Sequence, residues 1–294
     1  MFSDQRQLAS FKDTTMSRVF ATVIFGLAAS LCWGSGDFNG GLASRRANSS
    51  SVVIAAYGVG FVLLVGLALL WREPFPSLLD LFWGGLAGLA GAIGLISFYS
   101  ALSIGRMGIA APVSAVLTAS LPVLFSAFIA GLPSLLQLGG FVLALLAIAL
   151  ISRPERAKGR PKGIMLALLA GCGFGCFFIL ISRVSPSAIF WPLAMARFTS
   201  VLFLLIVVRI RQQPVLPKMT VAPLVLLAGV LDAMGNAFFI LAAHSGRLDV
   251  AAVLSSLYPA ATVLLAALLL RERVTRVQAV GILLALIAVP LISA

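Results

Sequence analysis

The sequence predicts an all-α membrane protein with ten transmembrane helices, arranged as two inverted five-helix repeats. Three observations predict this fold: an apolar composition, ten long apolar runs, and a self-match of the chain at a shift of 141 residues. Of the 294 residues, 61% are hydrophobic and 10% are charged, whereas soluble domains are about 45–50% apolar and about 25% charged. The composition therefore excludes a soluble enzyme, a DNA-binding domain and a disordered chain.

The net charge of +12 fits either a nucleic-acid surface or basic loops that orient helices in a membrane. The basic residues are scattered over short loops without interleaved aromatic residues, unlike a nucleic-acid-binding surface. We therefore expect a lipid bilayer as partner and no nucleic acid. We also expect no metal and no cofactor, because His244 is the only histidine and the three cysteines lie in apolar runs.

Ten apolar stretches come close to the length of about 20 residues that a helix needs to cross the hydrocarbon core. The predicted spans are 18–36, 48–70, 79–102, 107–130, 134–151, 163–182, 187–208, 220–243, 248–270 and 274–293. The links at 131–133 and 271–273 are so short that their flanking helices must form antiparallel hairpins. Prolines are expected to interrupt the fourth span at Pro112 and Pro122 and the ninth span at Pro259.

The self-match keeps a constant shift from the first span to the last. Gly105-Arg106 returns as Gly246-Arg247, Trp33-Gly34 faces Phe174-Gly175, Gln137 and Gly140 return as Gln278 and Gly281, and Leu150-Ile151-Ser152 returns as Leu291-Ile292-Ser293. Chance similarity between apolar helices would match Leu and Ala, but not glycines, an arginine and a glutamine in the same order.

Each half holds an odd number of spans, so the second half must insert with the opposite orientation. Such inverted repeats are typical of secondary transporters, with the substrate site near the midplane between them; the alternative is a duplicated bundle without a moving site. We expect a polar N-terminal tail at 1–17, a first five-helix repeat at 18–152, a basic linker at 153–162 and a second repeat at 163–294.

Several short motifs sit on this duplicated frame. They are Ala29-Ser30-Leu31-Cys32-Trp33-Gly34, Arg197-Phe198, Tyr258-Pro259, and Arg271-Glu272-Arg273-Val274-Thr275 before Gln278 and Gly281. With these motifs in this order, the chain after residue 17 resembles the EamA-type permeases of the drug/metabolite transporter superfamily. The resemblance implies a ten-helix carrier of small metabolites that works by alternating access around a central cavity. It does not name the substrate.

Two charged residues lie well inside predicted spans, Arg197 and Asp232, and Asp232 is the only acidic residue predicted deep in the membrane. A charge at the bilayer centre costs at least about 2.5–3.5 kcal/mol on insertion scales, so it faces a cavity or a partner. The pair therefore either lines a cavity, where Asp232 binds a cation or a proton and Arg197 a carboxylate, or forms a buried salt bridge. In the first half, Ala56 is equivalent to Arg197 and Gly91 is equivalent to Asp232.

Other polar and aromatic residues complete the predicted substrate site. Asn236 follows Asp232 by one helical turn and shares its face. Ser114 and Ser255 are equivalent serines of the two repeats, with hydrogen bonding between packed helices as their alternative role. Four aromatic residues are candidates for the walls, with packing or interfacial anchoring as the alternative. The predicted set is Trp33, Tyr99, Ser114, Phe174, Arg197, Asp232, Asn236, Ser255 and Tyr258.

Lys and Arg are unequally divided between the two sides of the predicted bundle. The side of both termini carries 6 of them, and the opposite side carries 14. An excess of Lys and Arg in short loops marks the cytoplasm, which would place the termini outside, whereas the family resemblance implies termini inside. The orientation therefore needs an experiment.

The expected function is secondary transport, in the export direction, of small metabolites such as amino acids or related compounds across a bacterial-type plasma (inner) membrane. Protons are the expected coupling ion, with Asp232 as their acceptor. The alternative is a multidrug or cation efflux permease. Two other classes fit the sequence less: a channel usually shows a ring of repeated pore residues, and a membrane-embedded enzyme needs clustered His, Asp or Glu. No enzyme activity is expected.

Overall fold

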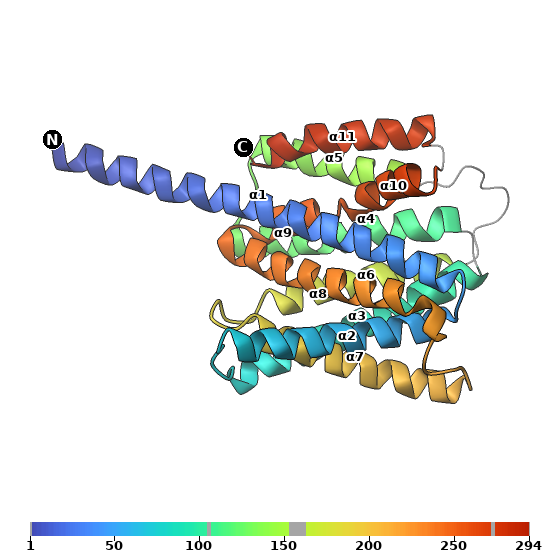
Figure 1. Ribbon diagram of the computed structural model, residues 1–294. Coiled ribbons are helices and arrows are strands. Elements are labelled where there is room, and N and C mark those ends of the chain that lie inside the picture. Colours follow the sequence, from blue (N-terminus) through green and yellow to red (C-terminus); the bar gives the residue numbers. More distant parts are fainter. Residues whose placement is uncertain (1, 105–106, 153–162, 272–273, 294) are drawn as a thin grey trace.

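Figure 1 shows the computed structural model, which describes residues 2–104, 107–152, 163–271 and 274–293. The side chains of 2–17, 99–100, 102–104, 107–112 and 293 lie outside the description. Every regular element among the described residues is a helix. The elements are α1 (Phe2–Ser44), α2 (Ser49–Leu70), α3 (Leu78–Ile104), α4 (Met107–Ala130), α5 (Leu135–Ile151), α6 (Ile164–Ile181), α7 (Phe190–Ile210), η1 (Met219–Val221), α8 (Ala222–Ser245), α9 (Leu248–Ser255), α10 (Tyr258–Leu269) and α11 (Arg276–Ser293).

Ten helical segments in this description account for the ten predicted spans, with α9 and α10 together forming the ninth. Eight segments are long and apolar enough to cross a membrane by length and composition. The other two, α5 and α11, have apolar stretches of 17 residues, Leu135–Ile151 and Arg276–Ile292, at the short end of the range for a spanning helix of about 17–25 residues. The chain is a multi-pass membrane protein.

The two halves are related by a pseudo-two-fold axis, and the contact between α5 and α11 shows this at the level of single residues. A Cβ added to Gly140 would lie 2.7 Å from the side chain of Ile292, and one added to Gly281 would lie 2.8 Å from that of Ile151. Gly140 and Gly281 are equivalent under the 141-residue shift, and so are Ile151 and Ile292. The inverted arrangement of the repeats therefore agrees with the structure.

The same reciprocity places the four helices that matter most for the site. Helix α1 packs along α8, and its equivalent α6 packs along α3, the equivalent of α8 (Figure 1). Gly235 of α8 makes room for the ring of Trp33, and Gly94 of α3 makes room for Phe174. Because each of these glycines lies against a residue of the other half, the core forms between the repeats rather than within them.

Helix starts are also repeated. Ser134 and Gln137 form a reciprocal capping box at the start of α5. At the start of α11, Gln278 Oε1 accepts the N–H of Thr275 at 3.0 Å, and Thr275 Oγ1 accepts the N–H of Gln278 at 3.2 Å. Such boxes satisfy backbone groups that a helix end leaves without partners, so the sequence fixes both hairpins in the same way.

The first helix differs from the prediction at both of its ends. The first span was expected to end at residue 36, but α1 continues to Ser44 and its candidate span runs over Arg18–Ser44. Glycines near its end do not stop it, because they let other helices approach: a Cβ on Gly34 would clash with the carbonyl oxygen of Tyr258. Backbone helix also extends from Arg18 back to Phe2, through the segment predicted as a polar tail.

The predicted proline interruptions hold for only one span. The ninth span is broken between Ser255 and Tyr258, and Pro259 occupies the first turn of α10, where its missing N–H costs no hydrogen bond. Helix α4, in contrast, runs without a break through Pro112 and Pro122. Pro112 and Pro122 therefore do not interrupt the fourth span.

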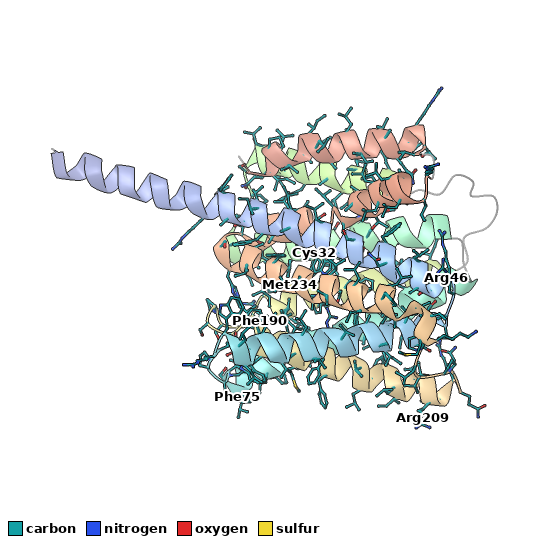
Figure 2. The ribbon with its side chains drawn as sticks, in the orientation of Figure 1. Cys32, Arg46, Phe75, Phe190, Arg209 and Met234 are labelled. Atoms are coloured by element: carbon teal, nitrogen blue, oxygen red, sulfur yellow. The ribbon has the colours of Figure 1, made fainter. Side chains whose placement is uncertain are left out.

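Both termini lie on the same side of the bundle (Figure 1), here called the terminal side, with the loops 71–77, 131–134, 182–189 and 246–247. The opposite side, here called the linker side, holds the loops 45–48 and 211–218. Figure 2 shows Arg46 and Arg209 at the linker side and Phe75 and Phe190 at the terminal side. Among the described residues, the linker side thus carries Arg45, Arg46, Arg211 and Lys218 in these loops, and the terminal side carries Arg72, Arg183 and Arg247.

Candidate functional site

A cavity of about 160 Å³ lies between the two halves of the bundle. It draws residues from α1, α2, α3, α4, α6, α7, α8 and α10, but none from α5 or α11. The lining residues are Trp33, Asp37, Tyr57, Gly91, Leu95, Thr118, Phe174, Phe177, Phe178, Arg197, Ser200, Asp232, Asn236 and Tyr258. Figure 2 shows Cys32 and Met234 in the middle of the bundle. Cys32 directly precedes Trp33, and Met234 lies two residues after Asp232.

Six of the nine predicted residues line this cavity: Trp33, Phe174, Arg197, Asp232, Asn236 and Tyr258. Ser114 and Ser255 do not. Both are buried, and the carbonyl of Ser114 lies where Gly171 brings α6 close to α4. Tyr99 belongs to α3, but its side chain lies outside the described residues.

Arg197 and Asp232 form an ion pair that joins α7 to α8 at the cavity wall. The Arg197 side chain is 6% exposed and that of Asp232 is 29% exposed, so the carboxylate is the more accessible partner. The Arg197 guanidinium carbon also lies 4.2 Å from the ring centroid of Tyr57, in a cation–π contact. The pair is thus a salt bridge that lines the cavity, and the binding roles of its two members stay a prediction.

Three neutral polar side chains of the cavity donate hydrogen bonds to backbone carbonyl groups. Asn236 Nδ2 donates to the carbonyl oxygen of Asp232 at 2.6 Å. Ser200 Oγ donates to the carbonyl oxygen of Gly88 at 2.8 Å, and Thr118 Oγ1 donates to that of Ser114 at 2.8 Å. The two hydroxyls therefore present acceptor oxygens to a ligand, whereas the amide of Asn236 keeps a second N–H donor.

Asp37 is the most important residue that the sequence analysis missed. Asp232 is not the only acidic residue deep in the bundle, because α1 continues past residue 36 and carries Asp37 to the same cavity. Asp37 is solvent-accessible, and within the described part of the chain its carboxylate has neither a hydrogen bond nor an ion pair. Its spacing of four residues from Trp33 was the signal that places both on one helix face.

Aromatic rings form much of the remaining wall. The ring of Trp33 stacks on Phe178 with centroids 5.4 Å apart and meets Tyr258 edge-on at 6.5 Å. Phe178 stacks in turn on Phe239 at 4.4 Å. Phe174 and Phe177 complete the aromatic lining from α6. The rings support one another from behind, so the face that they present to the cavity is rigid.

The cavity lies on the pseudo-two-fold axis, since four equivalent pairs line it. The pairs are Trp33 and Phe174, Asp37 and Phe178, Gly91 and Asp232, and Leu95 and Asn236. The repeats place them symmetrically, but their chemistry differs. Asp37, Asp232 and Asn236 form a polar wall on α1 and α8, whereas Gly91, Leu95, Phe174 and Phe178 form an apolar wall on α3 and α6.

At the terminal side, a carboxylate joins the halves. Glu73 accepts the backbone N–H groups of Ile189, of Phe190 at 3.0 Å and of Trp191 at 3.1 Å, at the start of α7. A carboxylate at a helix N-terminus satisfies free N–H groups and interacts favourably with the helix dipole. We call this set the terminal-side contact.

The equivalent place at the linker side is built from neutral groups. Ser50 Oγ donates to Gln213 Oε1 at 3.0 Å, and Ser51 Oγ donates to the carbonyl oxygen of Pro214. Pro214 is equivalent to Glu73 under the 141-residue shift. This linker-side contact therefore lacks the charge that holds the terminal side.

Comparison with known proteins identifies the family to which the duplicated sequence is similar. The sequence profile of the EamA-like transporter family matches twice, over residues 20–153 and 161–294. Among solved structures 25 chains match. One, described as "Crystal structure of protein", superimposes with a TM-score of 0.70 at 20% identity, covering 92% of this chain and 95% of that chain; this likeness shows the fold. No curated protein matches the sequence.

Proposed function

The chain belongs to the EamA-like transporter family, and on this premise we propose that it is a secondary transporter that exports small metabolites by alternating access. Family membership makes it a membrane transport protein for a small molecule. The proposal adds the mechanism, the direction, and a substrate class of amino acids or related compounds. It also adds a bacterial-type plasma (inner) membrane as the location.

One observation carries the proposal: the central cavity is lined by equivalent residues of two inverted halves. Exchanging the conformations of two such halves turns a cavity that opens to one side into one that opens to the other. Because the scaffold is nearly symmetric, the exchange costs little net free energy. The predicted site residues Trp33, Arg197 and Asp232 would then contact the substrate in both states.

Protons are the proposed coupling ion, with Asp232 as acceptor. Protonation of Asp232 would release Arg197 from its ion pair and so couple proton binding to the packing of α7 on α8. The test is uptake driven by a pH gradient in vesicles. Asp232→Asn should abolish the pH dependence, and unchanged pH-driven uptake by this variant would remove Asp232 from that role.

Counterflow in liposomes tests the transport mechanism itself. Purified protein is reconstituted with a trapped unlabelled compound from a metabolite panel, and entry of the labelled compound is followed. A carrier gives saturable entry that needs the trapped partner, whereas a channel gives entry that does not saturate. Non-saturable entry for every compound in the panel would contradict alternating access.

A matched pair of variants ties transport to the cavity. A Cβ on Gly91 would lie 3.3 Å from the ring of Phe177, so Gly91→Phe should fill the cavity. Gly66→Phe is the control, because nothing lies within 4 Å of a Cβ at that position. We expect counterflow to fall at least tenfold for Gly91→Phe and to stay within twofold for Gly66→Phe.

A further inference from the structure

The cavity has an uncompensated negative charge. Three charged side chains line it: Arg197, Asp232 and Asp37. Arg197 and Asp232 neutralise each other in their ion pair. The carboxylate of Asp37, which lines the cavity and is accessible to solvent, is left without a hydrogen bond or an ion pair among the described residues.

A positive charge that joins this carboxylate in the cavity is stabilised by it, and more strongly than in bulk water because apolar rings line the cavity beside it. Arg197, the cation of the cavity, offers no open site for a ligand anion. Arg197 is already engaged by Asp232 and by the ring of Tyr57. A ligand carboxylate would therefore have to break the ion pair between Arg197 and Asp232, whereas a ligand cation meets the unpaired carboxylate of Asp37.

The rings beside Asp37 point to the same chemistry independently. Trp33 lies one helical turn before Asp37 on the same face of α1, and Tyr258 stands edge-on to it at 6.5 Å. The faces of Trp and Tyr rings attract cations within about 6 Å of the ring centroid. The cavity already contains one such contact, between the Arg197 guanidinium and Tyr57.

The size of the cavity limits the ligand. Its volume of about 160 Å³ is close to that of an engineered apolar cavity of about 150 Å³ that binds benzene. Gly91, Leu95, Phe174 and Phe178, the residues of the apolar wall, line the same space as the polar wall. The ligand that fits has a charged end for α1 and an apolar body no larger than about one ring.

We propose that the substrate is a small organic cation, an ammonium compound with an apolar part of about one ring, whose positive charge is held by Asp37 and the ring of Trp33. This inference rests on the proposed transport function and narrows its substrate class. Among amino acids and related compounds it favours the amines, because a ligand carboxylate would need Arg197, which is held by Asp232 as long as the ion pair is intact.

The test is equilibrium binding of three probes that share one ring and differ in charge: benzyltrimethylammonium, benzyl alcohol and benzoate. Purified full-length protein in detergent should bind benzyltrimethylammonium at least tenfold more tightly than the other two. Asp37→Asn should weaken binding of the cation at least tenfold and leave benzyl alcohol within twofold. Asp13→Asn, which removes the same charge outside the candidate span, is the control and should bind like the parent.

Several results would overturn the inference. They are equal or tighter binding of benzoate or benzyl alcohol, or unchanged cation affinity in Asp37→Asn. If Asp37→Asn does not fold, as judged by its melting temperature, the charge series on the parent protein still decides.

Counterflow of the same probes separates this inference from the proposed function. A cation that binds through Asp37 but never exchanges across liposomes would support the binding site and contradict the cation as the transported substrate. Saturable exchange of another compound without cation binding would support transport and overturn the cation site.

Discussion

The polar wall and the apolar wall of the cavity occupy equivalent positions in a duplicated fold, yet they carry opposite chemistry. Asp232 and Asn236 on α8 stand where α3 has Gly91 and Leu95, and Asp37 on α1 stands where α6 has Phe178. Away from the cavity the repeats agree closely, as at Gly140 and Gly281. The comparison indicates that the shared residues build the scaffold, and that the residues which differ determine what the scaffold binds.

The largest expected effect comes from breaking the ion pair that only the second half possesses. Arg197→Ala leaves the carboxylate of Asp232 without its partner, and removing one member of a buried pair costs about 3 kcal/mol. The free energy of unfolding in detergent measures this loss. The double variant Arg197→Met/Asp232→Leu should recover most of it, and a single variant as stable as the parent would contradict a structural role for the pair.

The next effect tests the symmetry itself. Gly140→Val and Gly281→Val each force a side chain into the contact between α5 and α11, where overpacking costs about 1–3 kcal/mol. Because the two positions are equivalent, their losses of stability should agree within about 0.5 kcal/mol. Gly139→Val is the control, since a Cβ there meets nothing within 4 Å. Clearly unequal losses would argue against the pseudo-two-fold contact.

The terminal-side and linker-side contacts should differ in strength. Glu73→Gln removes a carboxylate from the start of α7, an interaction of up to about 2 kcal/mol. Hydrogen exchange at the amides of Phe190 and Trp191 should speed up by about tenfold. Ser51→Ala removes one hydroxyl bond of about 1 kcal/mol at the linker side, so its effect on the start of α2 should be smaller. The opposite ranking would contradict the charge argument.

The smallest perturbation determines which face lies in the cytoplasm. Leu132 at the terminal side and Leu216 at the linker side are both exposed loop residues, so replacing either by cysteine should leave stability unchanged. With termini inside, as the family resemblance implies, an impermeant thiol label should reach Leu216→Cys and Ala157→Cys in intact cells. It should reach Leu132→Cys only after lysis. The reverse pattern would follow the excess of Lys and Arg.

The sequence was sufficient to predict the fold because its signals are local or periodic. Apolar runs mark the spans, and the ordered glycines, with Gln137 and Gln278, reveal the duplication. Six of the nine predicted site residues line the cavity because a charged or aromatic residue at midspan has few other places to go. The serines were less predictable, since a hydroxyl can lie between packed helices as well as in a cavity; both are buried outside the cavity, and Ser255 Oγ has no hydrogen-bond partner among the described residues.

What could not be predicted depends on contacts between distant parts of the chain. Asp37 was placed outside the first span, which was expected to end at residue 36, although glycines flank it on both sides in a helix that continues to Ser44. They remain helical because α8 and α10 pack against them. The bonds from Glu73 to the start of α7 join loops more than a hundred residues apart. Nothing in the local sequence around Glu73 or Phe190 signals that pairing.

The interlocked packing of the halves has a consequence for how the protein is made. Helix α1 packs on α8, α3 on α6 and α5 on α11, so each helix of the first repeat finds its main neighbour in the second. During synthesis the first five helices therefore reach the bilayer before their packing surfaces exist. These helices lack their main packing partners until the second repeat has been synthesised. Final assembly is therefore a late step that involves the whole chain.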